Sequence, residues 1–545
     1  MKRPWFLWLA YGLIGLAVLA FVWYFVVYNV YAAALFRFPF DYEQGEGFEL
    51  MNVVWYARGE TPYRDTSTYP FFSTNYAPVF HLIILPLVLI FGPQYWTGRL
   101  VSYLGTLITA SAIGYAVHRE SRRWWLAVIS GLAFLASNYI YHVGPLFRQH
   151  LFMVMLETVA VVWLTRTVEK EEQSGQKHNW GWLVGMILLL LAGYTKQLAY
   201  ATIAAAFIFL FLRQWKRAIA WAIGFVVATG LVFVLLYWLT DGYWFISAVA
   251  SNINRFVPGQ TVAILRQFVS LHPVLVIVAA LFAVYQFYFE RLSLYSIWFV
   301  LTMLNGLTAG KWGAGESYYA TAIAAACLLS GVAFHRWLTW VERKAGTEKG
   351  PSSPVLRPFY PALALVLVAL LYLFQADRVF HMPTHTPFLR GVAAAVGKPT
   401  YVEIAPQTGC SDRRPVEKVY YVDSAGVSLL GVPPNDQDTA AGQAIAALVA
   451  ASGTPSFSED AGFNFYTNQE VLTNPPYILN LFENNLIDLS EMITALDQQS
   501  FGTVILRSQF YPYPVLQMIG QRYETNELIE MNGFVYCIMF PRGES

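Results

Sequence analysis

The chain has 545 residues, of which 56% are hydrophobic, 17% aromatic and only 13% charged. A soluble domain carries about 25% charged residues, so the composition excludes a soluble globular protein, a disordered chain and a coiled coil. The formal net charge of +1 gives no indication of a nucleic-acid partner. Residues 1–376 nevertheless hold 26 Lys and Arg against 16 Asp and Glu, whereas residues 377–545 hold 9 against 18. We therefore expect a membrane domain over 1–376 and an acidic soluble domain over 377–545.

The apolar residues are grouped into blocks that approach the ~20 residues needed to cross a bilayer. They predict a polytopic α-helical membrane protein with about 11 transmembrane helices. The predicted spans are 5–32, 97–117, 124–142, 147–165, 180–195, 198–212, 217–239, 272–289, 294–309, 317–335 and 359–376. A further apolar run, 77–92, is short and contains a proline, so we expect it to lie in the interface or to be re-entrant.

The basic residues orient these spans. If 77–92 does not cross, 17 Lys and Arg fall into short cytoplasmic segments: the N-terminus, 118–123, 166–179, 213–217, around Arg291 and 336–358. The positive-inside rule then predicts a multi-pass protein of the cell membrane with a cytoplasmic N-terminus. The first loop, 37–96, and the domain 377–545 are expected on the outer face. Cys410 and Cys537 both fall in that domain, where a disulfide is permitted.

The first outer loop carries the candidate catalytic groups. Asp41 follows the first span within a few residues, and partial desolvation there would raise its basicity. A base at this position could deprotonate an acceptor that attacks a lipid-linked donor. Glu43 and Glu46 are close enough to share a proton or a divalent cation, Mg²⁺ or Mn²⁺, with Asp41, and this choice stays open. Residues 45–58 are predicted to form an amphipathic interfacial helix.

Other polar residues on the outer side are candidates for substrate binding. Lys196 interrupts a long apolar run, and Lys311 and Glu316 lie in a glycine-rich loop. A buried lysine in such a place is costly unless it faces a cavity or a partner. Cations of this kind would hold a phosphate. The full predicted binding set is Lys196, Lys311, Glu316, Tyr63, Arg64, Tyr76 and Arg255.

The outer domain, 377–545, reads as a small α/β domain. The predicted strands are Val416–Val422, Val504–Arg507 and Phe534–Phe540. The predicted helices are Ala440–Ala451, Pro476–Asn484, Leu489–Gln498 and Pro514–Gln521.

A motif order across the first loop resembles the GT-C superfamily of membrane glycosyltransferases, which includes protein mannosyltransferases and lipid A aminoarabinose transferases. The matching residues are Asp41, Glu46 and Gly47, Gly59 to Asp65, Tyr76 to Pro78, Gly92 and Arg99, followed by Lys196-Gln197, Gly313 to Tyr319, Ser458 to Asp460 and Phe501-Gly502. The family's first acid is often followed directly by Glu, whereas Tyr42 intervenes here, so either Glu43 or Glu46 could support Asp41.

The resemblance implies an enzyme that moves a sugar from a polyprenyl-phosphate donor to a lipid, glycan or protein acceptor on the outer face, with Asp41 in the place of the catalytic acid. The alternative is a transporter or flippase of lipid-linked saccharides. That alternative predicts several charges at midplane and an internal repeat. Glu157 is the only acid well inside a predicted span, and no repeat of the halves is apparent.

Overall fold

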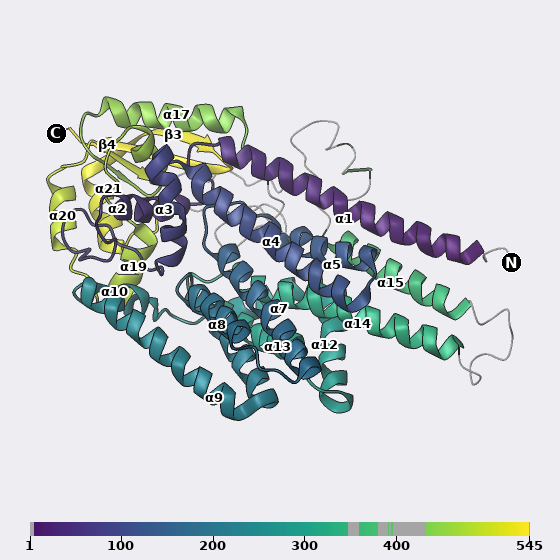
Figure 1. Ribbon diagram of the computed structural model, residues 1–545. Helices are drawn as coiled ribbons and strands as arrows, with labels where there is room; N and C mark the ends of the chain where they lie inside the picture. The colour runs from purple at the N-terminus through teal and green to yellow at the C-terminus, as the bar shows by residue number, and fades with distance from the viewer. Residues whose placement is uncertain (1–4, 347–358, 380–390, 392–393, 396–431, 544–545) are drawn as a thin grey trace.

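The computed structural model describes residues 5–346, 359–379, 391, 394–395 and 432–543. A helical bundle makes up most of the molecule, and a small sheet with its helices lies at one end of this bundle (Figure 1). The described part of the chain thus has the predicted architecture, a polytopic helical domain followed by a smaller α/β unit. The predicted strand at 416–422 and Cys410 lie outside the described residues.

Six helices in the described segments are long and apolar enough to cross a membrane, and a seventh candidate is a pair bent by 95°. The six are α1 (Trp5–Arg37), α4 (Tyr95–Ser121), α7 (His150–Ser174), α9 (Tyr200–Leu239), α14 (Ala320–Gly346) and α15 (Phe359–Arg378). The bent pair is α11 (Pro258–Leu271) with α12 (Pro273–Phe289), and shorter apolar helices are α3 (Val79–Phe91), α5 (Trp124–Ala136), α8 (Asn179–Gly193) and α13 (Leu294–Gly306). Every predicted span coincides with one of these helices.

One connection differs from the prediction. The segment 213–217 is not a loop, because α9 runs through it with a single non-helical residue, Gln214, at φ −145° and ψ 67°. The ring centroids of Phe207 and Phe225 nevertheless lie 5.4 Å apart. A straight helix would separate them by about 27 Å, so the two halves fold back on each other at Gln214. The two predicted spans are therefore present, with a sharp kink where we expected a basic loop.

The segments predicted to face the cytoplasm gather at one end of the bundle. Ion pairs join 118–123 to 166–179 and to 336–358, and join 166–179 to 213–217 and to Arg291. The pairs are Arg119–Glu169 at 3.0 Å, Arg123–Glu342 at 2.7 Å, Arg217–Glu171 at 2.8 Å and Arg291–Glu172 at 3.8 Å. Each of these five expected inner segments thus contacts another of them, whereas Lys2 and Arg3 of the N-terminus lie outside the described residues.

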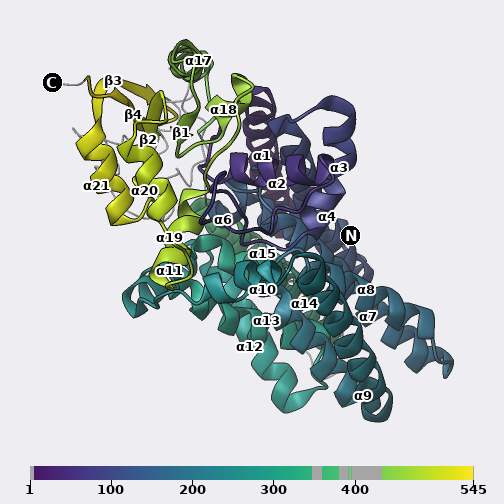
Figure 2. The same ribbon diagram turned by 90° about the vertical axis from the view of Figure 1, so that its left-hand side faces the viewer.

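The loop 37–96, which we expect on the outer face and call the first loop, lies at the opposite end, beside the sheet (Figure 1). It contains α2 (Glu46–Ala57), which confirms a helix in the predicted range 45–58, and α3. At 1.5 Å per residue the 13 residues of α3 extend about 20 Å, short of the ~30 Å hydrocarbon core. The loop therefore begins at α1 and returns to α4 at the same end of the bundle, as Figure 2 also shows.

The C-terminal unit, residues 432–543, is expected on the outer face and is called the outer unit below. It contains a four-stranded sheet in the order β1-β2-β4-β3. Its strands are β1 (Ser456–Ser458), β2 (Thr503–Leu506), β3 (Tyr523–Met531) and β4 (Phe534–Pro541), and only β1 and β2 are parallel. Its helices are α17 (Asp436–Ala451), α18 (Gly462–Tyr466), α19 (Pro475–Glu483), α20 (Ser490–Asp497) and α21 (Tyr513–Arg522). Strands β2 and β4 and four of the helices confirm predicted elements.

The outer unit packs directly on the first loop. Phe40 of the loop lies against Phe463 of α18, with ring centroids 5.6 Å apart. Ile445 and Tyr536 belong to the same buried apolar cluster as Phe40. Burying a large apolar side chain contributes about 1.5–3 kcal/mol, so this shared core holds the outer unit over the loop that carries the candidate site.

Candidate active site

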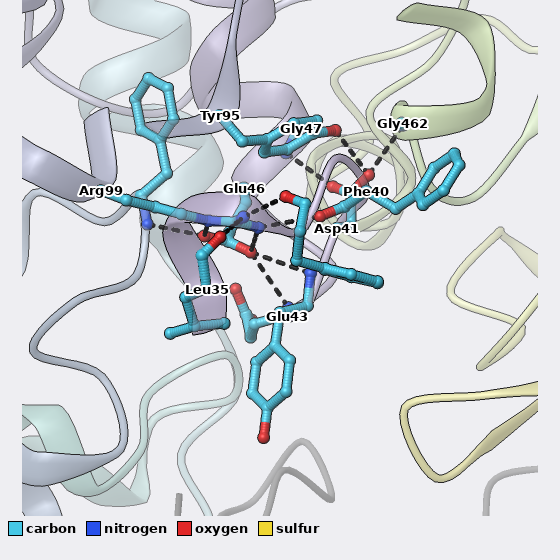
Figure 3. Close-up of polar contacts among 12 residues, drawn as sticks. Leu35, Phe40, Asp41, Glu43, Glu46, Gly47, Tyr95, Arg99 and Gly462 are labelled. Carbon is cyan, nitrogen blue, oxygen red and sulfur yellow. Dashed lines mark hydrogen bonds and ion pairs between the residues drawn. The ribbon is translucent and has the colours of Figure 1, made fainter. Parts of the chain in front are cut away.

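Asp41 lies at the junction of the first loop and the outer unit, and its side chain is buried. Its carboxylate accepts hydrogen bonds from Gly47 N at 2.6 Å, Gly462 N at 2.7 Å and the Tyr95 hydroxyl at 2.7 Å (Figure 3). Burial, and after it the nearby Asp460 carboxylate, raise the pKa of Asp41 well above its ordinary value. Asp41 therefore joins α2, α4 and α18.

Glu46 forms a buried ion pair with Arg99 of α4. The guanidinium donates to it from Nε and Nη2, both at 2.8 Å, and Phe147 N donates at 2.8 Å. Arg99 also donates to the backbone oxygens of Leu35, Phe38 and Phe40, where α1 ends (Figure 3). Glu46 thus fixes the start of the loop and has no exposed surface.

Glu43 points away from these two carboxylates, toward Arg148. The guanidinium of Arg148 holds both carboxylate oxygens of Glu43 at 2.6 Å and approaches Glu49 at 3.4 Å. Glu49 in turn lies 2.6 Å from His81 Nε2 on α3. Burial alone would lower the pKa of the Arg148 guanidinium, but the negative charges of Glu43 and Glu49 outweigh it, so the pKa is raised. The result is a continuous chain of contacts from Glu43 through Arg148 and Glu49 to His81.

The predicted metal set does not converge. Asp41, Glu43 and Glu46 are each committed to different donors, as described above, and the described residues contain no group of three His, Cys, Asp or Glu placed to hold a metal ion. Mg²⁺ would need oxygen ligands about 2.0–2.1 Å from one point. These carboxylates do not fit a divalent cation, and we derive no step through one.

A cavity of about 270 Å³ opens beside this chain of contacts. The first loop and Arg148 form one wall, the segment Trp312–Ala314 forms another, and α19 of the outer unit covers it. The lining residues are Glu43, Gln44, Gly45, Phe48, Glu49, Asn52, Asn75, Tyr76, Arg148, Gln260, Trp312, Gly313, Ala314, Asn474, Pro476, Tyr477, Asn480 and Phe510. Of the three predicted catalytic carboxylates, only Glu43 lines the cavity, and Asp41 and Glu46 lie behind its wall.

Two of the predicted cations lie at the edge of the cavity. The Lys196 ammonium contacts His150 Nε2 and lies 5.4 Å from the ring of Tyr76, a cavity residue. Burial, followed by Arg148 and Lys311, lowers the pKa of Lys196 well below its ordinary value, and Glu49 opposes this. Lys311 adjoins the cavity residue Trp312, and burial lowers its pKa as well. An anion here would relieve the repulsion between these cations.

The remaining predicted binding residues are divided between structural and peripheral positions. Tyr63 is buried and donates to Tyr76 O at 2.7 Å, so it supports the loop. Arg64 lies over the Trp55 ring at 4.5 Å, and Arg255 is exposed. Glu316 is buried at the start of the 3₁₀ turn 316–319. None of these four is a cavity-lining residue.

A second, apolar groove of about 190 Å³ lies on the other side of the same segment. It runs between α8, α9 and α10 (Tyr243–Ala248), and its lining includes Leu190, Ile203, Phe225 and Phe233. Tyr76 lines the polar cavity and the next residue, Ala77, lines this groove. Tyr194 and Gln197, which flank Lys196, also line the groove.

Comparison with known proteins agrees with this architecture. Residues 75–238 match the family model described as dolichyl-phosphate-mannose-protein mannosyltransferase. The apo structure of ArnT from Cupriavidus metallidurans is 14% identical with a TM-score of 0.54, and its structure bound to undecaprenyl phosphate is 13% identical with a TM-score of 0.53. Each comparison covers 95% of this chain and 97% of the other. The chain therefore shares the fold of these ArnT structures.

An archaeal oligosaccharyltransferase from Archaeoglobus fulgidus is 12% identical over 91% of this chain and 69% of its own, with a TM-score of 0.49. No curated protein matches the sequence. The family match and the long apolar helices of the described segments both indicate a multi-pass membrane protein.

Several residues of the site were missed by the sequence analysis. Glu49 and His81, which the sequence analysis does not single out, are both buried and paired with each other. The two residues are 32 positions apart, and no sequence motif links them. The available signal was that each lies on an apolar helix, where a buried polar group needs a partner. Asn474, Tyr477 and Asn480 come from the outer unit, and nothing in their local sequence indicates that α19 covers the cavity.

Proposed function

We propose that the protein transfers a sugar from a polyprenyl-phosphate donor to an acceptor, a lipid, glycan or protein, on the outer face of the membrane. One observation carries this proposal: Tyr76 lines a polar cavity, and the next residue, Ala77, lines an apolar groove. Lys196 lies where the cavity and the groove meet, near the ring of Tyr76. A donor of this class has the same order of parts: a polar sugar, an anionic phosphate and an apolar chain. The bound undecaprenyl phosphate of the Cupriavidus metallidurans ArnT supports the same class of ligand.

The cations would bind the phosphate. Lys196 and Lys311 would act as point charges, and the donor's chain would follow the groove between α8 and α9. As the bond between the anomeric carbon and the phosphate oxygen breaks, negative charge grows on the leaving phosphate. Ammonium groups fixed beside that oxygen stabilise the charge.

Glu43 is the carboxylate that we assign to the acceptor. It lines the cavity, and its side chain keeps 14% of its surface exposed, whereas Asp41 and Glu46 are buried behind it. The acceptor's oxygen or nitrogen would form the new bond to the anomeric carbon, and its proton would pass to Glu43. Arg148 holds Glu43 in one orientation through both of its oxygens. Asp41 is then a positioning residue.

The test is release of labelled sugar from synthetic polyprenyl-phosphate hexose and pentose donors by purified protein in lipid vesicles, with membrane extract as the source of acceptors. We expect Lys196→Met and Glu43→Gln each to lower turnover by at least ~100-fold. Lys170→Met, which changes an exposed lysine at the opposite end of the bundle, is the matched control. No release from any donor, together with movement of labelled donor across the vesicle bilayer, would overturn the proposal in favour of a flippase.

We further propose that the N-terminus is cytoplasmic and the outer unit extracytoplasmic in the cell membrane. Gln94 is exposed between α3 and α4, and Lys170 is exposed at the other end. A cysteine at Gln94 should react with an impermeant thiol reagent in intact cells, and one at Lys170 only after permeabilisation. The reverse pattern would show that the orientation is inverted.

A further inference from the structure

Glu157 is a buried acid in α7 that does not line the cavity, and the mechanism proposed above does not use it. Its side chain is only 1% exposed. A carboxyl group inside a membrane-spanning helix is costly unless its oxygens are paired, and such a residue is a candidate for a functional role. The partners of Glu157 therefore indicate what it does.

Two threonine hydroxyls pair with this carboxyl group. Thr202 Oγ1 donates to Oε1 at 2.5 Å, and Thr321 Oγ1 donates to Oε2 at 2.7 Å. Trp298 Nε1 of α13 donates to Thr202 Oγ1 at 2.9 Å, so this hydroxyl is itself held in place. Thr202 lies in the first turn of α9 and Thr321 in the first turn of α14. Glu157, Thr202 and Thr321, which we call the threonine clamp, therefore join α7 to the starts of two other helices.

The ammonium group of Lys196 is surrounded by side chains from the same part of the fold. Lys196 Nζ contacts His150 Nε2 and lies 5.4 Å from the ring of Tyr76 and 5.7 Å from the ring of Tyr318. An aromatic ring within about 6 Å attracts an ammonium group. His150 is the first residue of α7, Lys196 precedes α9, and Tyr318 lies in the 3₁₀ turn before α14. Only Tyr76, from the first loop, comes from elsewhere.

Each clamp residue follows one of these residues closely on the same segment. The pairs are His150 and Glu157, Lys196 and Thr202, and Tyr318 and Thr321, which are seven, six and three residues apart. Seven residues are about two helical turns, so the first pair lies on one face of α7. The clamp thus fixes the relative positions of the three segments that place Lys196, His150 and Tyr318.

We propose that Glu157 is a positioning residue, whose hydrogen bonds to Thr202 and Thr321 hold the Lys196 ammonium where the cavity and the groove meet. This inference rests on the proposed function, in which Lys196 binds the donor phosphate. The role needs two hydrogen bonds and no proton transfer. A glutamine can make both bonds, because its amide has an acceptor and a donor and a threonine hydroxyl can act as either.

The experiment uses the full chain in lipid nanodiscs and has two measurements. The first is the pH at which acetylation of Lys196 by acetic anhydride reaches half its maximal rate in the free protein, with the exposed Lys170 as internal reference. Burial, Arg148 and Lys311 lower the pKa of Lys196, and Glu49 and Glu43 oppose them. The variants below leave these groups and His150 unchanged. The second measurement is the affinity for polyprenyl phosphate.

We expect Glu157→Leu to move the half-maximal pH of Lys196 up toward that of Lys170, because the ammonium group is no longer held in its buried place. The affinity for polyprenyl phosphate should fall about tenfold, since catalytic and binding groups are sensitive to small displacements. Thr202→Val and Thr321→Val should each act in the same direction, by about threefold, the effect of one hydrogen bond. Glu157→Gln should behave like the wild type. The matched control is Thr158→Val, at a buried threonine of α7 that donates only to Val154 O of its own helix, at 2.7 Å.

If Glu157→Leu fails to fold, the two threonine variants carry the same expectation. Variants that melt at a lower temperature but keep the wild-type acetylation profile and affinity would overturn the inference, because Glu157 would then only stabilise the bundle. Loss of affinity in Glu157→Gln, with both threonine variants unchanged, would overturn it in favour of proton passage through Glu157. A wild-type protein that binds no polyprenyl phosphate, with the acetylation profiles shifted as expected, would instead overturn the proposed function and support the placement of Lys196.

Discussion

The backbone N–H of Gly462 donates a 2.7 Å hydrogen bond to the carboxylate of Asp41, which lies 421 residues earlier in the chain. This contact joins α18 of the outer unit to the first loop, directly behind the cavity. Asn532 supports the same junction, since its Nδ2 donates to Asp41 O at 3.3 Å. The position of α19 over the cavity therefore depends on how closely Gly462 approaches Asp41.

The first prediction concerns this close approach. A Cβ at Gly462 would lie 2.7 Å from Asp41 Oδ2, so Gly462→Ala must push the outer unit away from the loop. We expect a loss of about 1–3 kcal/mol in the free energy of unfolding, from the lost hydrogen bond and poorer packing. Gly520→Ala is the matched control, because a Cβ in that helical position meets nothing within 4 Å and should be neutral or stabilising. Thermal unfolding in detergent measures both, and equal melting temperatures for the two variants would contradict the prediction.

The second prediction concerns pH. Burial and the carboxylate of Asp460 raise the pKa of Asp41, and burial also raises that of Asp460. A carboxyl whose pKa is higher in the folded state binds protons on folding, in the window between its ordinary pKa of about 3.9 and the raised value. Stability is therefore greatest below this window and falls as pH rises through it.

Asp41→Asn removes one of these titrating groups. We expect a lower melting temperature overall, but a smaller fall in melting temperature between about pH 5 and about pH 8 than in the wild type. The difference between the two slopes is the measurement, since other groups affect both proteins alike. Parallel slopes would contradict a raised pKa at Asp41.

The sequence predicted the helices well because their signal is local. Apolar blocks of nearly membrane length identify each span without knowledge of its neighbours. The exposed edge strand β3 was missed, because residues such as Glu524 and Glu527 make it polar and its burial comes only at its ends. The Asn532-Gly533 pair between β3 and β4, with φ of 52° and 77°, is the hairpin signal that could have found it.

The site was harder to predict because it is assembled from distant segments. The sequence indicated the loop that lines the cavity and the lysine beside it, Lys196, since a charge in an apolar run stands out. It could not distinguish Asp41, Glu43 and Glu46, which differ only in what they meet: Gly462, Arg148 and Arg99. Those partners lie 53 to 421 residues away, and no local pattern encodes them.

The third prediction concerns Lys196. Burial and the neighbouring Arg148 and Lys311 lower its pKa. In the free protein the Lys196 side chain therefore loses its proton at a lower pH than an ordinary lysine does. An anionic phosphate restores the charged form, so binding takes up protons and the affinity falls as pH rises through the lowered pKa. Lys196→Arg should bind polyprenyl phosphate with little pH dependence, because a guanidinium stays protonated.

Calorimetry in buffers of different ionisation enthalpy measures the proton uptake directly. The wild type and the control Lys170→Arg should both take up protons when polyprenyl phosphate binds, and Lys196→Arg should not. Uptake that persists in Lys196→Arg would assign the titrating group to another residue.

The fourth prediction separates a positioning role of Glu46 from a catalytic one. Glu46 and Arg99 are both without exposed surface, so Glu46→Gln leaves a buried guanidinium without its counter-ion. Breaking a buried pair in this way costs about 3–5 kcal/mol. The matched control is Glu342→Gln, which breaks the half-exposed pair with Arg123 at the opposite end of the bundle and should cost no more than about 1 kcal/mol.

We expect Glu46→Gln to lower the melting temperature and the yield of folded protein much more than Glu342→Gln. A Glu46→Gln protein that melts like the wild type but no longer releases sugar would show instead that this carboxylate acts in the reaction, and the assignment of Glu43 would then have to be revised.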